Sequence, residues 1–159
     1  MSYLHWKLLH IISVVIFLGN ITTGLFWAAR ANKSGNLGQV ASTFDSIIMS
    51  DRWLTIPGVI GILVSGFVGA MVGELPILRT GWIFWPAMLF LVSGVIFGIW
   101  VGPLQRKIAT LANAGYASEE SWAEYRKLYR SWELWGIAAL LTPVIALIIM
   151  VLKPGLPAL

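Results

Sequence analysis

Residues 53–73 read WLTIPGVIGILVSGFVGAMVG and contain no charged side chain, although Arg52 and Glu74 stand directly on either side. About 20 apolar residues in a helix are what the hydrocarbon core of a bilayer requires. Three other stretches have the same character, and the predicted membrane-spanning helices are 7–29, 53–73, 81–102 and 133–152. Because these runs are continuously apolar rather than short and alternating, they predict helices and not a β-barrel.

The composition of the whole chain agrees with these four stretches. Hydrophobic residues make up 58% of the sequence, charged residues 11%, and the mean hydropathy is +0.81, whereas about 25% of residues are charged in a typical soluble domain. The 159 residues suit one domain. We therefore expect residues 1–159 to form a single integral membrane domain of the all-α class, a four-helix transmembrane bundle that lies in the lipid bilayer.

The basic residues predict how this bundle is oriented. Eight of the 11 Lys and Arg residues lie in the connections between the first and second and between the third and fourth spans, and only Lys7, Arg79 and Lys153 lie on the other side. By the positive-inside rule, both long connections face the cytoplasm and both termini lie outside a bacterial inner membrane. These basic connections also account for the net charge of +4, so no nucleic-acid partner is expected.

Both long connections carry helical patterns of their own. In the first, apolar residues recur at helical spacing and predict a short amphipathic helix on the membrane surface: Leu37, Val40, Phe44, Ile47 and Ile48. In the second, Asn113, Gly115 and Ser118 mark a break, Glu119 and Glu120 suit a first helical turn, and Ser121-x-x-Glu124 resembles a capping box.

An aromatic stripe follows that predicted helix start, formed by Trp122, Tyr125, Tyr129 and Trp132. It favours an interfacial helix that runs into the fourth span, and the alternative is a face for a partner protein. Two small-residue patterns, Ser65-x-x-x-Gly69 and Gly94-x-x-x-Gly98-x-x-x-Gly102, predict close approach between helices, because packing in lipid depends on small side chains.

His10 is the only ionisable side chain between the charged residues that bound the four spans. At 100° per residue, Ser13, Phe17, Asn20 and Gly24 fall within about 80° of it, so this face is expected to turn inward. The candidate cofactor-binding residues are His10, Ser13, Asn20 and Gly24, with His10 as the axial ligand of a haem b iron. The alternative is that His10 lies near the outer interface and bonds a neighbouring helix.

The residue inventory excludes several other chemistries. His5, the second histidine, points about 140° away from His10 on a helix, so a dihaem carrier with four axial histidines is excluded. The spans hold no Asp or Glu that could relay protons. With two histidines and no cysteine, the chain cannot build a zinc or copper cage.

Several short motifs resemble a bacterial family of integral membrane proteins, domain of unknown function 2269. They are Trp6-Lys7-x-x-His10-Ile11-Ile12 followed by Gly19, Pro57 with Gly66, Gly81-Trp82, and Leu152-Lys153-Pro154. That family is similar in pattern to the four-helix, haem-b-containing protoporphyrinogen IX oxidases and to copper-resistance D-type membrane proteins. The resemblance implies that His10 matches the first-helix histidine of the oxidases, a haem ligand, and that Lys153 matches a lysine at the end of their fourth helix.

One departure from the oxidases bears on function. Those enzymes carry a basic residue early in the third helix, whereas Gly81–Pro86 contains none and only Arg79 precedes it. The sequence therefore favours a small accessory or structural subunit, with a membrane-protein partner or a second copy of itself, over an enzyme. The alternative is a haem- or porphyrin-binding redox protein with His10 as axial ligand.

Overall fold

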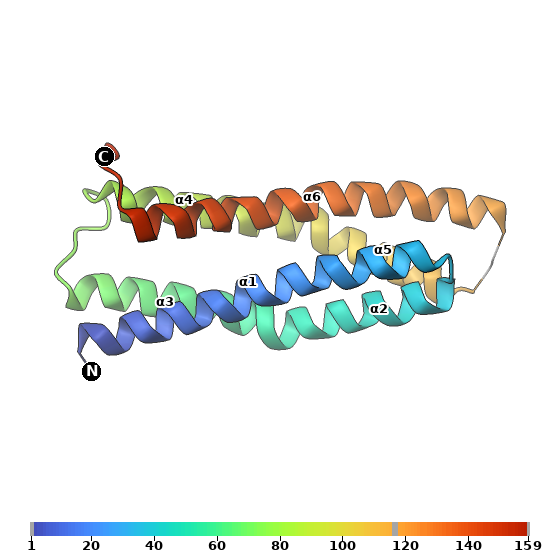
Figure 1. The fold of residues 1–159 in the computed structure, drawn as a ribbon, viewed down its shortest axis with the longest axis horizontal. Coiled ribbons are helices and arrows are strands. Elements are labelled where there is room, and N and C mark those ends of the chain that lie inside the picture. Colours follow the sequence, from blue (N-terminus) through green and yellow to red (C-terminus); the bar gives the residue numbers. More distant parts are fainter. Residues whose placement is uncertain (1, 116–117, 159) are drawn as a thin grey trace.

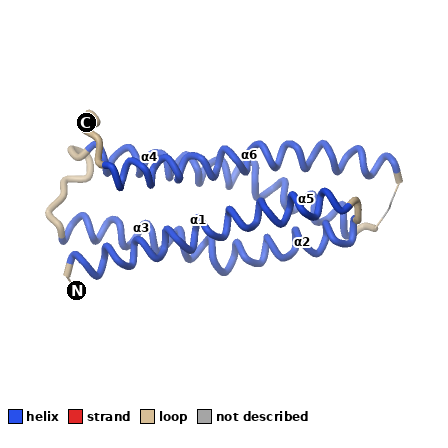
Figure 2. Tube along the Cα trace, in the orientation of Figure 1, coloured by secondary structure: helices blue, strands red, loops and turns tan. Residues whose placement is uncertain are grey.

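The computed structural model describes residues 2–115 and 118–158, and within these ranges every regular element is a helix (Figures 1 and 2). The elements form four long helices: α1 (Tyr3–Ser34); α2 (Leu37–Ser50), the π-helical turn η1 (Asp51–Thr55) and α3 (Ile56–Val72); α4 (Gly81–Ile96), the π-helical turn η2 (Phe97–Val101) and α5 (Gly102–Asn113); and α6 (Glu119–Leu152). All four are long and apolar enough to cross a membrane. The predicted all-α, four-helix transmembrane bundle is confirmed.

The bundle has two halves that are packed differently. At the end that holds both termini, α1 lies against α3 and α4 lies against α6, but no backbone contact within 8 Å joins α3 to α4 or α6 (Figure 1). At the opposite end, α2, α5, the start of α6 and the end of α1 close around one apolar core. This core includes Ala28, Val40, Phe44, Ile108, Tyr125 and Trp132.

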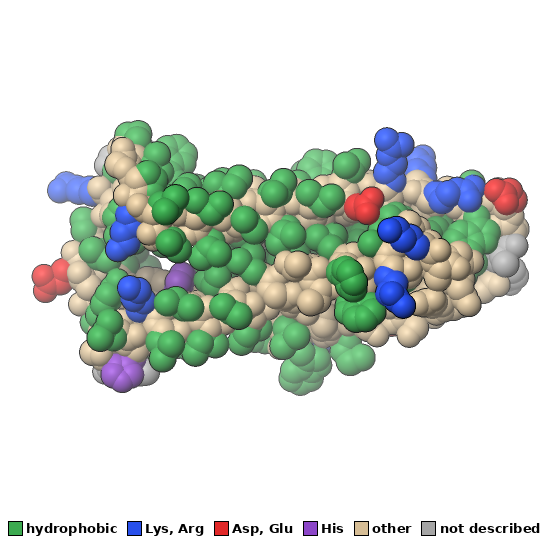
Figure 3. Space-filling model, viewed as in Figure 1, with side chains coloured by type: hydrophobic (Ala, Val, Ile, Leu, Met, Phe, Trp, Pro, Cys, Tyr) green, Lys and Arg blue, Asp and Glu red, His purple; other side chains and the backbone are tan. Residues whose placement is uncertain are grey.

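The surface changes character between the two halves. Large exposed hydrophobic side chains occur only within residues 4–27, 49–99 and 134–152, and the described parts of 28–48 and 100–133 have none. Helices of 32 to 36 residues are about 48 to 54 Å long, which exceeds the roughly 30 Å of hydrocarbon in a bilayer. We infer that the half with the termini, here called the membrane half, faces lipid and that the other, extramembrane half reaches into water; Figure 3 shows the apolar band with charged groups toward both ends.

The amphipathic helix predicted in the first connection forms, but in a different place. Its apolar face includes Val40 and Phe44, both at 0% exposure. It does not lie as a separate helix on the membrane surface, because α2 runs through η1 into α3 as one helix, Leu37–Val72. The apolar face packs on α5 and α1 instead of on lipid, and the ring of Phe44 meets the Trp132 ring of α6 edge to face at 5.0 Å.

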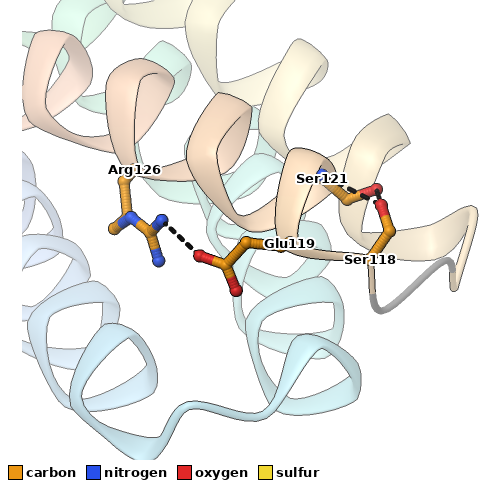
Figure 4. A network of polar contacts seen from close by, with 4 residues as sticks. All are labelled: Ser118, Glu119, Ser121 and Arg126. Atoms are coloured by element: carbon orange, nitrogen blue, oxygen red, sulfur yellow. Dashed lines mark hydrogen bonds and ion pairs between the residues drawn. The ribbon is translucent and has the colours of Figure 1, made fainter.

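The predicted capping box at the start of α6 is wrong by one turn (Figure 4). Helix α6 begins at Glu119, and the hydroxyl of Ser118 accepts a hydrogen bond from the backbone N–H of Ser121 at 3.2 Å. Glu119 and Glu120 lie in the first turn, as expected, and Glu119 pairs with Arg126 at 3.2 Å. Ser118 is the N-cap residue of α6 because its extended backbone lets its side chain reach the free N–H groups of the first turn.

The helix that carries the aromatic stripe runs into the fourth span, as predicted, because α6 is continuous from Glu119 to Leu152, but the stripe itself packs in the core instead of at an interface or on a partner. Tyr125 is 1% exposed, Tyr129 and Trp132 are buried, and Trp122 is half-buried. The Tyr125 hydroxyl donates to Oδ1 of Asn32 on α1 at 3.0 Å. The stripe faces α1, α2 and α5 because the helices continue past the lipid and must bury their apolar faces against each other.

The two small-residue patterns differ in whether another helix of the chain packs on them. The face that carries Ser65 and Gly69 packs on α1, where a Cβ placed on Gly69 would lie 3.5 Å from Cβ of Trp6. A Cβ on Gly94 or Gly98 would meet nothing within 4 Å. The first pattern therefore joins two helices of the chain, whereas the second leaves an open face at Gly94 and Gly98 and only its last member, Gly102, is buried.

Candidate functional site

His10 is held against α3 through one edge of its ring. Its Nδ1 lies 3.1 Å from the carbonyl oxygen of Ile62 and 3.2 Å from Oγ of Ser65. A Cβ on Gly66 would lie 3.1 Å from Cε1 of the same ring. Glycine at position 66 therefore lets the imidazole approach the backbone of α3 closely.

The hydrogen bonds of His10 decide which ring nitrogen carries the proton. The carbonyl of Ile62 can only accept, and the hydroxyl of Ser65 gives its own proton to the carbonyl of Gly61. Both partners are thus acceptors, so we infer that Nδ1 is the donor and that Nε2 of the neutral ring keeps a free lone pair. Nε2 has no hydrogen-bond partner within the described ranges.

The residues predicted to share the face of His10 do turn inward, but they serve two different places. Ser13, Phe17 and Asn20 are buried. His10 and Ser13 lie at the interface of α1 with α3, where the Ser13 hydroxyl stands directly opposite Gly61. Asn20 and Gly24 lie farther along α1 and line an internal cavity. The sequence placed these residues on one face of α1, but that face contacts different helices at different points along its length.

A polar cluster that the sequence did not predict lies beside that cavity. Asp51 in η1 accepts hydrogen bonds at Oδ1 from Nδ2 of Asn20 (3.2 Å) and from the hydroxyl of Thr55 (2.7 Å), and at Oδ2 from Nε2 of Gln105 (2.8 Å). Asn20 also donates to the Thr55 hydroxyl at 2.8 Å. Three of the four long helices therefore contribute to one buried network around a carboxylate.

The cavity has a volume of about 100 Å³ and lies between α1, α4, α6 and the two π-helical turns. Its polar edge is the cluster just described, and most of the remaining wall is apolar. Aromatic side chains supply much of that wall: Phe17, Phe90, Phe97 and Trp132. Both π-helical turns contribute to the lining, and such turns often occur at functional sites because each inserts an extra residue and redirects side chains.

The Asp51 cluster was not predicted, because the charge-free run that defines the second span begins after Arg52 and Asp51 lies outside it. Its signal in the sequence was the i, i+4 pair of Asp51 and Thr55, which lie on one helix face. The role of Trp132 in the cavity wall was also not predicted, because this residue was assigned to the membrane–water interface. In the structure it is 3% exposed and lines the cavity. Asp51 lies just before the predicted second span, so the expectation that the spans themselves hold no carboxylate stays a prediction, but a part-buried carboxylate does lie between the helices at that level.

The residues that could hold a metal are few. No group of three or more His, Asp or Glu side chains with metal-binding geometry occurs in the described part of the chain. His5 lies exposed near the N-terminus and contacts the Ser2 hydroxyl at 2.7 Å. Of the two histidines, only His10 lies between helices, so its Nε2 is the imidazole nitrogen that could ligate a haem iron inside the bundle.

Lys153 lies at the end of α6 with its Nζ 4.4 Å from the ring centre of Trp82. This cation–π contact places the lysine beside the start of α4. The third helix has no basic residue there, as the sequence indicated, and Lys153 brings a positive charge to the same level from the fourth helix.

Fold and site together define a small integral membrane protein with four membrane-crossing helices and polar side chains enclosed between them. The chain belongs to the family described as predicted integral membrane protein (DUF2269), whose model matches residues 4–154. Searches among curated proteins and among solved structures found no match. The predicted family is confirmed, and the similarity to the oxidases and the copper-resistance proteins stays a prediction.

Proposed function

We propose that this protein binds haem b, or a related porphyrin, in the membrane half, with Nε2 of His10 as the axial ligand. The observation that carries the proposal is the pair of hydrogen bonds at Nδ1. Histidines that bind metals commonly donate their other ring N–H to a carbonyl or carboxylate, which fixes the ring and raises the basicity of the ligating nitrogen. A bound haem would supply one-electron redox chemistry.

Two further features support this site. The α1–α3 pair and the α4–α6 pair do not pack on each other through α3, and Figure 3 shows a hollow between the two layers at the end with the termini. Three basic residues belong to the segments at that end: Lys7 near the start of α1, Arg79 between α3 and α4, and Lys153 directly after α6. Basic side chains are suitable partners for the two propionate groups of a haem.

The test is an optical spectrum of the protein purified in detergent from haem-replete cells, recorded before and after reduction with dithionite. We expect a Soret band that His10→Ala abolishes and that the control His5→Ala retains, because His5 lies exposed at the chain start. A parallel melting curve shows whether each variant is folded. A featureless wild-type spectrum, or an unchanged band in folded His10→Ala, would overturn the proposal.

A second candidate function is an interaction subunit that associates with a second copy of itself. It is favoured by the open face at Gly94 and Gly98, because exposed small residues on a lipid-facing helix allow another helix to approach closely. The mass of the detergent-solubilised protein, measured by light scattering, should then correspond to a dimer, and Gly98→Leu should yield monomers. A wild-type monomer at all concentrations rules this candidate out.

We further propose that the protein resides in a bacterial inner membrane with both termini outside. The basic residues of the extramembrane half support this orientation, since positive charge is retained on the cytoplasmic side.

A further inference from the structure

The inward face of α6 ends in a methionine. The buried residues of this helix follow one another at alternating intervals of four and three positions: Tyr125, Tyr129, Trp132, Gly136, Ala139, Pro143 and Ala146. Intervals of three and four keep residues on one side of an α-helix. The next position in the series is Met150, which is half-buried. The series therefore places Met150 on the side of α6 that faces the interior of the bundle.

The interior that Met150 faces is shared with the His10 side of α1. Both sides line the internal cavity, α6 through Trp132, Gly136 and Ala139 and α1 through Phe17, Asn20 and Gly24. His10 precedes those α1 residues on the same helix face, and Met150 follows those α6 residues. Because the cavity joins the two faces, His10 and Met150 belong to opposite walls of the same interior.

Met150 also lies at the level of His10 along the bundle. The two helices run in opposite directions, since α1 begins at the end with the termini and α6 ends there (Figure 1). A Cβ on Gly136 would lie 3.1 Å from Cδ2 of Leu25, so these two residues mark one level. From Leu25 back to His10 the helix rises about 22 Å, and from Gly136 on to Met150 it rises about 21 Å toward the same end.

The two layers of helices have parted at this level. Within the described residues, no backbone contact within 8 Å joins α1 to α4, or α3 to α4 or α6, and Figure 3 shows the hollow between the layers at the end with the termini. Three other methionines, Met49, Met71 and Met88, are exposed at the surface. Among the methionines that the structure describes, Met150 is therefore the one that lies across this hollow from His10.

We propose that Sδ of Met150 on α6 is the second axial ligand of the haem iron, opposite Nε2 of His10 on α1. This inference rests on the haem binding proposed above. The thioether is an uncharged, soft ligand that suits the interior of a membrane bundle, and three rotatable bonds let the sulfur reach the metal without a shift of the backbone. A histidine–methionine pair raises the reduction potential of a haem, so the site is suited to accept electrons.

The test uses the full-length protein purified in detergent with haem bound, and it compares Met150→Leu with the wild type. Leucine nearly conserves the volume of methionine but lacks the sulfur. In the oxidised wild type we expect the weak far-red absorption band of a sulfur–iron(III) bond, and this band should disappear in Met150→Leu while the Soret band remains. The midpoint potential of the variant should fall, and its reduced form should bind carbon monoxide, which the six-coordinate wild type excludes.

Met71→Leu is the matched control, because Met71 is exposed near the end of α3. Its far-red band and midpoint potential should equal those of the wild type. A far-red band that persists in Met150→Leu, or that is lost equally in both variants, overturns the assignment of Met150.

The outcomes separate this inference from haem binding itself. A wild type without a Soret band overturns both, whereas a Soret band that depends on His10 but comes without the far-red band overturns ligation by Met150 alone. If Met150→Leu does not fold or does not retain haem, near-infrared magnetic circular dichroism of the oxidised wild type decides, because the energy of its charge-transfer band differs between a histidine–methionine pair and other axial pairs. A band at the energy of any other pair contradicts the assignment.

Discussion

Hydroxyl-bearing and glycine residues lie at the contacts between helices in the membrane half. The Ser93 hydroxyl on α4 donates to the carbonyl of Ala139 on α6 at 2.7 Å. Ser65 lies between α3 and α1, where it accepts from His10. Because lipid offers helices little hydrophobic reason to associate, such close contacts and interhelical hydrogen bonds hold the two pairs together.

Gly61 provides a test of how tightly α1 and α3 pack. A Cβ at this position would overlap the hydroxyl of Ser13 and lie 3.1 Å from its Cβ. Gly61→Ala should therefore lower the free energy of unfolding by about 1–3 kcal/mol through overpacking, visible as a lower melting temperature in detergent. Gly19→Ala on α1 is the matched control, because Gly19 is exposed and a Cβ there meets nothing within 4 Å; equal melting temperatures would mean that the helices are not in close contact.

At the scale of elements, α2 and α5 extend the second and third long helices into the extramembrane half of the bundle. Each continues a membrane helix through a π-helical turn, and the two pack on each other, while α5 also packs on α6 and α2 on α1. Most of their apolar residues face inward, and within the described ranges Met49, near the end of α2, is the one large hydrophobic side chain that these two helices expose. This arrangement is that of a water-soluble helical bundle, with an apolar stripe inside and a polar surface.

Phe44 tests whether this extension folds as part of the same bundle. The side chain is fully buried against Trp132, so Phe44→Ala should lower the free energy of unfolding by about 3–5 kcal/mol. Met49→Ala, which removes an exposed side chain near the end of the same helix, should have little effect. The measurement is thermal unfolding followed by circular dichroism in detergent, and similar curves for both variants would show that α2 is not docked.

At the scale of the whole molecule, both termini lie at one end and the two long connections at the other (Figure 1). An even number of crossings requires this arrangement, and the sequence adds the direction through its basic residues. The structure thus leaves two orientations, related by turning the molecule over, and the positive-inside rule chooses between them.

Cysteine labelling tests the proposed orientation, because the chain has no native cysteine. We expect Ala158→Cys to react with a membrane-impermeant maleimide in intact cells, since the terminus is proposed to lie outside. Ala114→Cys, exposed at the opposite end, should react only after the cells are lysed. The reverse pattern would mean that the molecule is inserted upside down.

The sequence by itself determined the number and type of the helices and which faces turn inward. Charge-free runs of membrane length and residues at helical spacing depend only on neighbours along the chain, which is why the face of Ser13, Phe17 and Asn20 could be predicted. Sequence also supplied the family, through motifs spread over residues 4–154.

Only the tertiary structure decided which helix each face meets. The partners of Asp51 are Asn20, 31 residues earlier, and Gln105, 54 residues later, and no periodicity within one helix relates residues so far apart. The extension of the helices beyond the lipid turned the aromatic stripe and α2 from expected surface features into core. The physical reason is that a helix pattern fixes an apolar direction, whereas the neighbour that covers it, lipid or protein, depends on how all four helices assemble.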